Sequence, residues 1–398
     1  CRFCDPPARM RICLVYDCLF PWTVGGAERW MRNLAETLAG HGHEVTYLTR
    51  LQWDPDGDDV PDLPGVRVIA VSRREDLYGP DGNRTIGEPL RFGAGVLRHL
   101  WRHGGDYDVV HTASFPYFSL LAAGVARRRH RKRFGIVADW HEVWSDAYWS
   151  EYLGGPKGVI AREIQKACAR VPQDAFCFSE LHALRLREIG LRGTPTVLRG
   201  EYAGALDRPD PVKIDPAAPQ VVFAGRLIPE KQAPALVPAI ALAAERVDGL
   251  RGVIYGDGPQ RGAVDAAIAA LGPDAPVRAP GFVDADELHA ALASALCMVL
   301  PSRREGYGMV VVEAAASGVP SVVVRAPDNA AVELVEDGVN GVVAASAEAA
   351  DLADAIVRVH AGGHALREST ADWFARNASE LSLHTSLERV VARYGRER

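Results

Sequence analysis

The segment from Pro301 to Val324, PSRREGYGMVVVEAAASGVPSVVV, carries the residue types best suited to chemistry. An apolar strand pattern ends at Leu300, and a loop then brings Glu305 and two glycines to a helical pattern that begins near Met309. Glycines let backbone N–H groups approach a ligand, and a helix N-terminus favours phosphate. Glu313 falls just over one turn into that helix. One carboxylate could therefore meet sugar hydroxyls and the other a ribose; the alternative is an acidic loop followed by an ordinary helical glutamate.

Strands must hold this loop in place, and short apolar runs alternate with helical patterns along the chain. Such alternation, with strands that are apolar almost throughout, predicts parallel sheets covered by helices on both faces. The strands predicted in the first half are 11–16, 44–49, 66–71, 108–111, 134–138 and 174–178. The helices predicted between them are 26–40, 90–103, 114–127, 156–170 and 180–189.

The alternation pauses at residues 200–219, a proline-rich stretch that predicts a linker. A second series of strands is predicted at 220–224, 251–255, 297–300 and 320–324. A chain of 398 residues also exceeds the size that one hydrophobic core usually reaches. We therefore predict two Rossmann-like α/β domains, each with a doubly wound parallel sheet. Ligands of such sheets bind at the carboxyl ends of the strands, so an interdomain cleft is the expected site.

The composition is that of an ordinary globular protein, with 48% hydrophobic and 24% charged residues. A formal net charge of -6 argues against a nucleic-acid-binding protein. The sequence contains no apolar run long enough to span a bilayer, and its first twenty residues lack the pattern of a secretory signal. These features predict a cytoplasmic protein. Met10 resembles a natural start, so residues 1–9 are left out of the fold prediction.

Two groups of residues have the types, but not the setting, of metal ligands. Cys1 and Cys4 form a C-x-x-C among seven scattered cysteines, and reduced thiols fit this pattern better than a zinc site does. Asp56, Asp58 and Asp59 lie in a loop rich in Pro and Gly rather than at a strand end. We therefore predict no metal site.

The spacing of Glu305 and Glu313 within EGYGMVVVEAAASGVPSV resembles the E-x7-E signature of glycosyltransferase family 4, whose members are retaining enzymes with the GT-B fold. The resemblance implies that Glu305 contacts the donor sugar, that Glu313 binds the ribose, and that loop amides bind the sugar hydroxyls. The loop residues implied are Gly306, Tyr307, Gly308 and Met309. Tyr307 and Met309 stand where the family often has Phe and Leu.

The segment FAGRLIPEK resembles the family motif that supplies a phosphate-binding Arg and Lys, here Arg226 and Lys231. Two cations at the carboxyl end of a strand suit the charge of a departing diphosphate. The alternative is a pair of solvated surface cations.

YGDGP at 255–259 resembles a family turn beside the nucleotide pocket and includes Gly256. Arg261 occupies the place of the third glycine of a dinucleotide-binding fingerprint, which argues against an NAD oxidoreductase. Phe282 and Val283 resemble the segment whose backbone recognises the base, although a buried strand end would look the same.

In the first half, Gly25 and Gly26 follow the first strand and open a helix. The family uses such a loop to approach the diphosphate and the acceptor; the alternative is a turn that merely starts a helix. His141, in ADWHEVW, falls where the family has a His beside the donor sugar. Asp139 and Glu142 lie alongside, and the resemblance implies a site role for His141.

Two further features of the first half have open interpretations. The aromatic residues near His141 suit an acceptor or core packing equally well, and the candidates for the acceptor are Trp140, Trp144 and Trp149. The run Arg127–Arg133, RRRHRKR, would either contact anionic lipid peripherally or form a solvated helix end.

The resemblance implies a GT-B architecture with an acceptor-binding domain at 10–199, a linker at 200–219 and a nucleotide-sugar-binding domain at 220–375. A helix at 376–398 would cross back to the first domain. The region LRGEYAGALD departs from the family's usual turn into the linker.

The expected reaction is retaining transfer of a hexose-type sugar from a nucleotide diphosphate sugar, UDP first, to a hydroxyl-bearing acceptor, without a cofactor or an essential metal. The expected catalytic residues are His141, Glu305, Arg226 and Lys231. The alternatives are a sugar-nucleotide epimerase, an inverting transferase of the same fold, and a catalytically silent scaffold.

Overall fold

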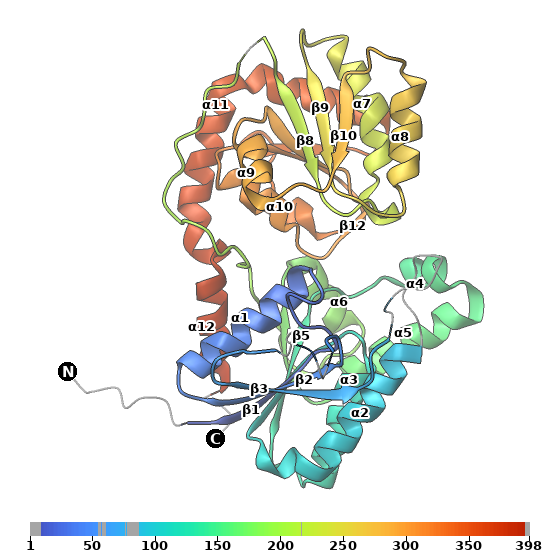
Figure 1. Ribbon diagram of the computed structural model, residues 1–398, viewed down its shortest axis with the longest axis vertical. Helices are drawn as coiled ribbons and strands as arrows, with labels where there is room; N and C mark the ends of the chain where they lie inside the picture. The colour runs from blue at the N-terminus through green and yellow to red at the C-terminus, as the bar shows by residue number, and fades with distance from the viewer. Residues whose placement is uncertain are drawn as a thin grey trace, which may run out of the picture. The chain divides into compact units, whose positions relative to one another are not determined.

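A computed structural model describes residues 9–54, 57, 61–75, 77, 87–215 and 217–394 (Figure 1). The chain folds as two units, each with its own sheet. The N-terminal unit comprises the chain up to Leu198 together with the segment from Ser386, and the C-terminal unit comprises Arg199–Thr385. The predicted metal-ligand candidates Cys1, Cys4, Asp56, Asp58 and Asp59 lie outside the described residues.

The N-terminal unit is built on a seven-stranded sheet in the order β3-β2-β1-β4-β5-β6-β7, in which every pair is parallel. Its strands are β1 (Arg11–Val15), β2 (Glu44–Arg50), β3 (Val66–Ser72), β4 (Val109–Ala113), β5 (Gly135–Trp140), β6 (Asp174–Cys177) and β7 (Thr196–Val197). Its helices are α1 (Gly26–Gly40), α2 (Gly87–His103), α3 (Phe118–Arg129), α4 (Asp146–Leu153), α5 (Gly155–Ala169), α6 (Glu180–Glu188) and most of α12 (Leu383–Tyr394). The central strands β4 and β5 are buried along their whole length, as a sheet covered on both faces requires.

The C-terminal unit has a six-stranded parallel sheet in the order β10-β9-β8-β11-β13-β15, of which Figure 1 labels β8, β9 and β10. Its strands are β8 (Gln220–Ala224), β9 (Arg251–Tyr255), β10 (Val277–Gly281), β11 (Cys297–Leu300), β13 (Ser321–Val324) and β15 (Gly341–Ala344). A short parallel pair, β12 (Arg304–Glu305) and β14 (Asp328–Asn329), lies outside this sheet. The helices are α7 (Leu236–Ala244), α8 (Arg261–Ala270), α9 (Ala285–Ala293), α10 (Met309–Ala315) and α11 (Ala349–Leu381).

The sequence predicted the central strands of both sheets and the edge strand β3, and missed the other three edge strands. The strands β10 and β15 occupy the two edges of the C-terminal sheet, and β7 is an edge of the other. The sequence of β10, VRAPG, alternates in exposure and contains Pro280, which an edge strand tolerates because one row of its N–H groups has no partner. The edge strand β10 therefore lacks the continuous apolar run that identifies a central parallel strand.

The long helix α11 contains a break at Gly363, whose φ of 51° and ψ of -141° are not helical. Beyond the break, Arg367 is buried and its guanidinium donates to the carbonyls of Ala293 (2.8 Å) and Ala295. Burial lowers the pKa of Arg367 to about 10. This side chain fastens α11 to the turn that leads into β11.

Candidate functional site

Backbone hydrogen bonds tie together the loops that follow β8, β9 and β10. The amide of Gly225 donates to the carbonyl of Tyr255 (3.2 Å), and the amide of Gly256 donates to that of Gly281 (2.9 Å). Gly256 has a φ of 124°, and a Cβ placed there would lie 1.9 Å from the carbonyl oxygen of Gly225. Only glycine allows the strand ends to approach so closely. The contact gives Gly256 a definite structural role at the carboxyl edge of the sheet.

Lys231 and Glu305 meet at this edge in an ion pair between Nζ and Oε2. The two side chains are only 18% and 14% exposed. The hydroxyl of Ser302 also donates to Oε2 of Glu305 (3.2 Å). Lys231 comes from a 3-10 turn after β8 and Glu305 from the loop after β11, so neighbouring strands position the pair.

Asn329 holds the Glu305 loop through buried hydrogen bonds. This residue was not identified from the sequence. This buried side chain donates to the carbonyls of Ser302 (2.9 Å) and Val324 (2.8 Å) and accepts from the amide of Ala331 (3.1 Å). β12 and β14 also pair Glu305 with Asn329. A single Asn after an Ala-Pro-Asp run carries no sequence signal for this role, because its contact with Ser302, 27 residues earlier in the chain, forms only when the chain folds.

The loop between Glu305 and α10 has little exposed side chain, because it contains two glycines and a buried tyrosine. Gly308 adopts a φ of 101° as the residue before α10, and a Cβ there would lie 2.7 Å from that of Ala331. The side chain of Tyr307 is buried, and its hydroxyl donates to the carbonyl of Arg199. Tyr307 therefore anchors the loop. Gly306 and Met309, on either side, are partly exposed.

The remaining predicted donor residues of the C-terminal unit lie on or beside the same strand ends. Arg226 follows β8 and is exposed, and Glu313 lies in α10 and is partly buried. Phe282 follows β10 directly, and its side chain is 87% exposed, an unusual state for a ring of that size. Val283 is partly exposed. Arg261 donates to the carbonyl of Ala279 (2.6 Å) and so supports β10.

In the N-terminal unit, Gly25 is the extended residue before α1 and Gly26 is its first residue. A Cβ on Gly25 would lie 2.3 Å from a carboxylate oxygen of Glu28. Glu28 also accepts from the hydroxyl of Tyr16 (3.4 Å). The start of α1 is therefore tied to the end of β1, the arrangement expected of a loop that approaches a ligand.

A buried polar network lies at the carboxyl end of β5. Asp139 is fully buried, accepts from the indole of Trp30 (2.6 Å) and forms an ion pair with Nε2 of His111 (2.8 Å). Nδ1 of His111 is hydrogen-bonded to the hydroxyl of Tyr394, in α12. Burial raises the pKa of the Asp139 carboxyl, but the charge and hydrogen bond of His111 outweigh burial and hold the pKa below its usual value. The network joins residues far apart in the sequence.

His141 lies two residues beyond Asp139 and stacks on Phe178, with ring centroids 4.5 Å apart and planes 9° from parallel. Phe178 in turn meets the edge of Trp30 (5.0 Å), whose indole binds Asp139. Burial lowers the pKa of His141, against the opposing effect of the Asp139 carboxylate. The imidazole of His141 is therefore neutral near pH 7, fixed in plane, and able to donate or accept a hydrogen bond.

Family models match both halves of the chain. The model described as "Glycosyl transferase 4-like domain" matches residues 25–200, and the model described as "Glycosyl transferases group 1" matches residues 218–361. The chain belongs to the family 4-like glycosyltransferases.

This glycosyltransferase is 28% identical over 380 residues to a glycogen synthase of Mycobacterium tuberculosis, covering 87% of the chain and 85% of that relative. Among solved structures it is similar to sucrose-phosphate synthase of Thermosynechococcus elongatus, with a TM-score of 0.78, 20% identity and coverage of 97% and 98%. It is also similar to Anabaena HepE in complex with UDP-glucose, with a TM-score of 0.70, 20% identity and coverage of 97% and 99%. The fold is therefore GT-B.

The three tryptophans near His141 have different surroundings in this glycosyltransferase. Trp140 is fully buried and donates to Gln173 (2.9 Å), so its ring belongs to the core and does not reach an acceptor. Trp144 is partly exposed, whereas Trp149 is largely buried. Both stand among other aromatic rings, with their own centroids 4.4 Å apart.

The basic run Arg127–Arg133 ends α3 and turns into β5. Arg127 donates to the carbonyl of Phe134 (2.8 Å), and Arg129 lies over the ring of Trp101 (5.6 Å). Arg131 and its neighbours on the turn are exposed. Part of the run therefore stabilises the helix end, and part is available to solvent.

Neither a group of metal-ligating side chains nor a helix long and apolar enough to cross a membrane occurs in the described part of the chain. Five cysteines of that part are buried free thiols: Cys13, Cys18, Cys168, Cys177 and Cys297.

Proposed function

We propose that this glycosyltransferase transfers a hexose-type sugar, with retention of configuration, from a nucleotide diphosphate sugar to a hydroxyl acceptor. The pairing of Lys231 with Glu305 at a glycine-rich strand edge carries the proposal. A cation and a carboxylate side by side suit the phosphate and the hydroxyls of a sugar diphosphate. A UDP donor is our first choice, since the structurally similar HepE binds UDP-glucose.

In the proposed binding mode, the C-terminal unit holds the donor. Arg226 and Lys231 would contact the diphosphate, and the start of α10 would add its N–H groups and positive dipole. Glu305 would accept from the sugar hydroxyls and Glu313 from the ribose. Phe282, which is 87% exposed, and Val283 would lie beside the base, with Gly256 keeping the neighbouring turn close.

The N-terminal unit would act on the sugar from its own strand ends. Gly25, the residue before α1, and Gly26, its first residue, have no side chain and would let a diphosphate or an acceptor approach the backbone. His141, neutral and held flat on Phe178, would hydrogen-bond the donor sugar near its reacting carbon.

The proposed reaction replaces one bond to the anomeric carbon with another on the same face. The bond from that carbon to the diphosphate oxygen breaks, and a bond to the acceptor oxygen forms. The acceptor's proton passes to the departing phosphate, whose negative charge Arg226 and Lys231 stabilise. Glu305 orients the sugar and forms no covalent bond. We propose neither a metal nor another cofactor for these steps.

Three substitutions test the proposal: Glu305→Gln, Arg226→Ala and Lys231→Ala. Each should lower turnover with a competent UDP-sugar by roughly 10²–10³-fold, because each removes a group that stabilises the transition state. Arg251→Ala is the matched control, since Arg251 is exposed at the amino end of β9 and should leave turnover near wild type. Wild-type turnover in all three variants would refute the assignment.

Proton NMR of the anomeric centre of the product tests retention. A product with the donor's configuration supports the mechanism, and an inverted product would require a general base in its place. Contact of Arg127–Arg133 with anionic lipid and a cytoplasmic location stay predictions from the sequence.

A further inference from the structure

An apolar pocket of about 220 Å³ opens in the N-terminal unit near the carboxyl ends of β4 and β5. Aromatic rings form much of its wall, together with aliphatic side chains of α5. The principal lining residues are Phe115, Tyr117, Trp144, Trp149, Tyr152 and Ile160. Trp144 has its ring centroid 5.9 Å from that of Phe115 and 5.2 Å from that of Tyr152.

Buried polar groups hold the wall of this pocket in place. Gln165 is fully buried, accepts from the amide of Trp144 (3.0 Å) and donates to the carbonyl of the same residue (3.0 Å). The hydroxyl of Tyr117 donates to Gln165 as well (2.8 Å). The Trp144 indole donates to Glu142 (2.6 Å). The rings are therefore fixed before any ligand arrives, which reduces the entropy lost on binding.

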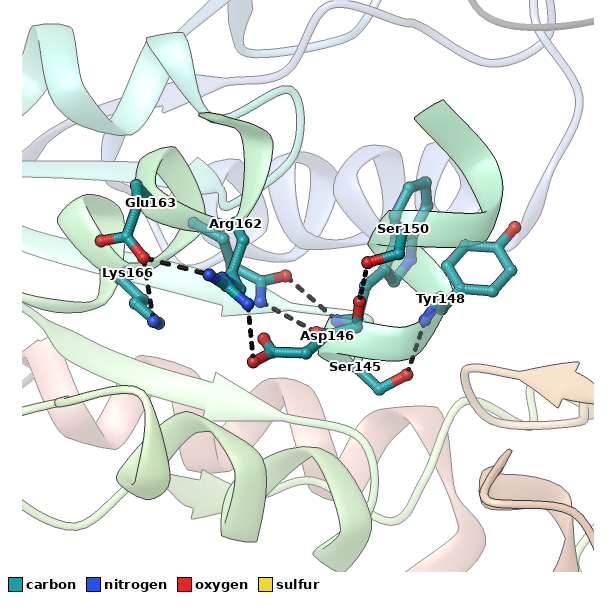
Figure 2. A network of polar contacts seen from close by, with 9 residues as sticks. Ser145, Asp146, Tyr148, Ser150, Arg162, Glu163 and Lys166 are labelled. Carbon is teal, nitrogen blue, oxygen red and sulfur yellow. Dashed lines mark hydrogen bonds and ion pairs between the residues drawn. The ribbon is translucent and has the colours of Figure 1, made fainter. Parts of the chain in front are cut away.

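The helices α4 and α5 form the outer wall, and Figure 2 shows the contacts that join them. Asp146 at the start of α4 pairs with Arg162 of α5 (3.1 Å), and Ser145 caps α4 by accepting from the amide of Tyr148 (3.1 Å). Gly158 brings α5 against α4, because a Cβ there would lie 2.6 Å from the carbonyl oxygen of Trp149. The two helices thus form a braced pair.

The lining favours an apolar ring and disfavours a sugar or a phosphate. Among the described residues of the lining, Lys157 alone is charged, and its side chain is exposed. The hydroxyl of Tyr117 is already used by Gln165. Apart from the Trp149 indole N–H, the Tyr152 hydroxyl and the Lys157 ammonium, the lining offers few groups to replace the hydrogen bonds to water that buried sugar hydroxyls would lose. A cavity of about 150 Å³ can hold benzene, so this pocket suits one substituted ring or a fused pair.

Trp144, which lines the pocket, follows His141, the residue proposed to act on the sugar, by three residues in the loop after β5. We infer that the acceptor of this enzyme carries an aromatic or alicyclic ring that this pocket binds, with the reacting hydroxyl outside it. The inference rests on the proposed function and adds the chemical class of the acceptor.

Substitution at the mouth of the pocket tests the inference. Ile160 lines the pocket and is 60% exposed, so Ile160→Asp should fold normally while placing a charge beside a bound ring. Val159→Asp is the matched control, because Val159 is the preceding residue of the same helix, is 47% exposed and does not line the pocket. Circular dichroism and thermal melting would establish that both variants are folded.

The first measurement is binding, detected as quenching of tryptophan fluorescence during titration with 2-naphthalenemethanol. Ile160→Asp should weaken binding about tenfold or more, and Val159→Asp should match wild type. Equal binding by all three proteins, or no binding by any, would overturn the inference. This titration needs no sugar donor, so it tests whether the pocket binds an aromatic ring even if the proposed function is wrong.

The second measurement compares acceptors with UDP-glucose as donor. Wild type should transfer sugar to 2-naphthalenemethanol with a higher kcat/KM than to glycerol or n-octanol, and Ile160→Asp should reduce that preference. A preference for n-octanol would overturn the inference that the pocket binds a ring. Dimers of wild type in sedimentation that Ile160→Asp dissociates would also overturn it, because the pocket would then be covered by a second copy of the chain. Absence of both hydrolysis and transfer with every nucleotide sugar tried would count against the proposed function instead.

Discussion

The carboxyl ends of the two sheets use charge in opposite ways. In the C-terminal unit, Lys231 and Glu305 lie on loops and keep 18% and 14% of their side chains exposed. In the N-terminal unit, Asp139 and His111 are fully buried and bind protein groups on each side. The carboxyl edge of the C-terminal sheet therefore carries accessible charged side chains. That of the N-terminal sheet carries charged side chains that are buried among aromatic rings.

This difference distinguishes side chains that would contact a ligand from side chains that position other residues. The proposed contact with a diphosphate requires an accessible charge, and the charged loops of the C-terminal unit are joined by close backbone contacts such as Gly225 to Gly256. A charge that holds an aromatic ring in position acts best when it is buried away from water, because its hydrogen bonds are stronger at low dielectric. Asp139 therefore acts on His141 through Trp30 and Phe178.

Asp139→Ala should have the largest effect on stability. Removing this carboxylate leaves Trp30 and His111 buried without their acceptor, and the loss should be about 3–5 kcal/mol in the free energy of unfolding at pH 7. Urea titration of wild type and variant measures it. Asp265→Ala is a control on an exposed pair and should change little.

The same variant predicts a pH dependence. Because the folded protein holds the pKa of Asp139 below the unfolded value of about 3.9, the stabilisation is complete above that value and is lost as the pH falls through the lower folded pKa. The gap between wild type and Asp139→Ala should therefore narrow below about pH 4. A gap that stays constant down to acid unfolding would show that folding does not lower the pKa of Asp139.

Gly256→Ala should have the next largest effect, now in the C-terminal unit. A methyl group at a φ of 124° and 1.9 Å from the Gly225 oxygen must displace backbone, and the strain should cost roughly 1–3 kcal/mol or more. Gly262→Ala is the matched control, because it lies in α8 with no atom within 4 Å of the added Cβ and should be neutral or stabilising. Thermal melting of both variants distinguishes them, and equal melting temperatures would contradict the close contact.

Tyr394→Phe should have the smallest effect, about 1 kcal/mol, since it removes one hydrogen bond to His111 and keeps the packed ring. Hydrogen exchange at the β4 and β5 amides should increase modestly. Unchanged exchange and stability would show that the network gains nothing from the C-terminal helix and ends at His111.

Much of the C-terminal unit could be predicted from sequence because its site is local. The strands β8, β9 and β11 have continuous apolar runs, and their loops carry glycines and charges next to them in the chain. Lys231 and Glu305 belong to two separate sequence motifs, and the structure brings them into one ion pair. The edge strand β10 was missed because its burial alternates.

The sequence by itself determined two α/β halves, the positions of most strands along the chain and the residue types that follow the strands of the C-terminal sheet. Only the tertiary structure decided that Trp140 lies in the core while Trp144 lines a pocket, and that Asp139, His111 and Tyr394 form one network. The reason is physical. A local pattern records which face of an element is apolar, whereas a buried hydrogen bond or a pocket wall depends on segments that folding alone brings together.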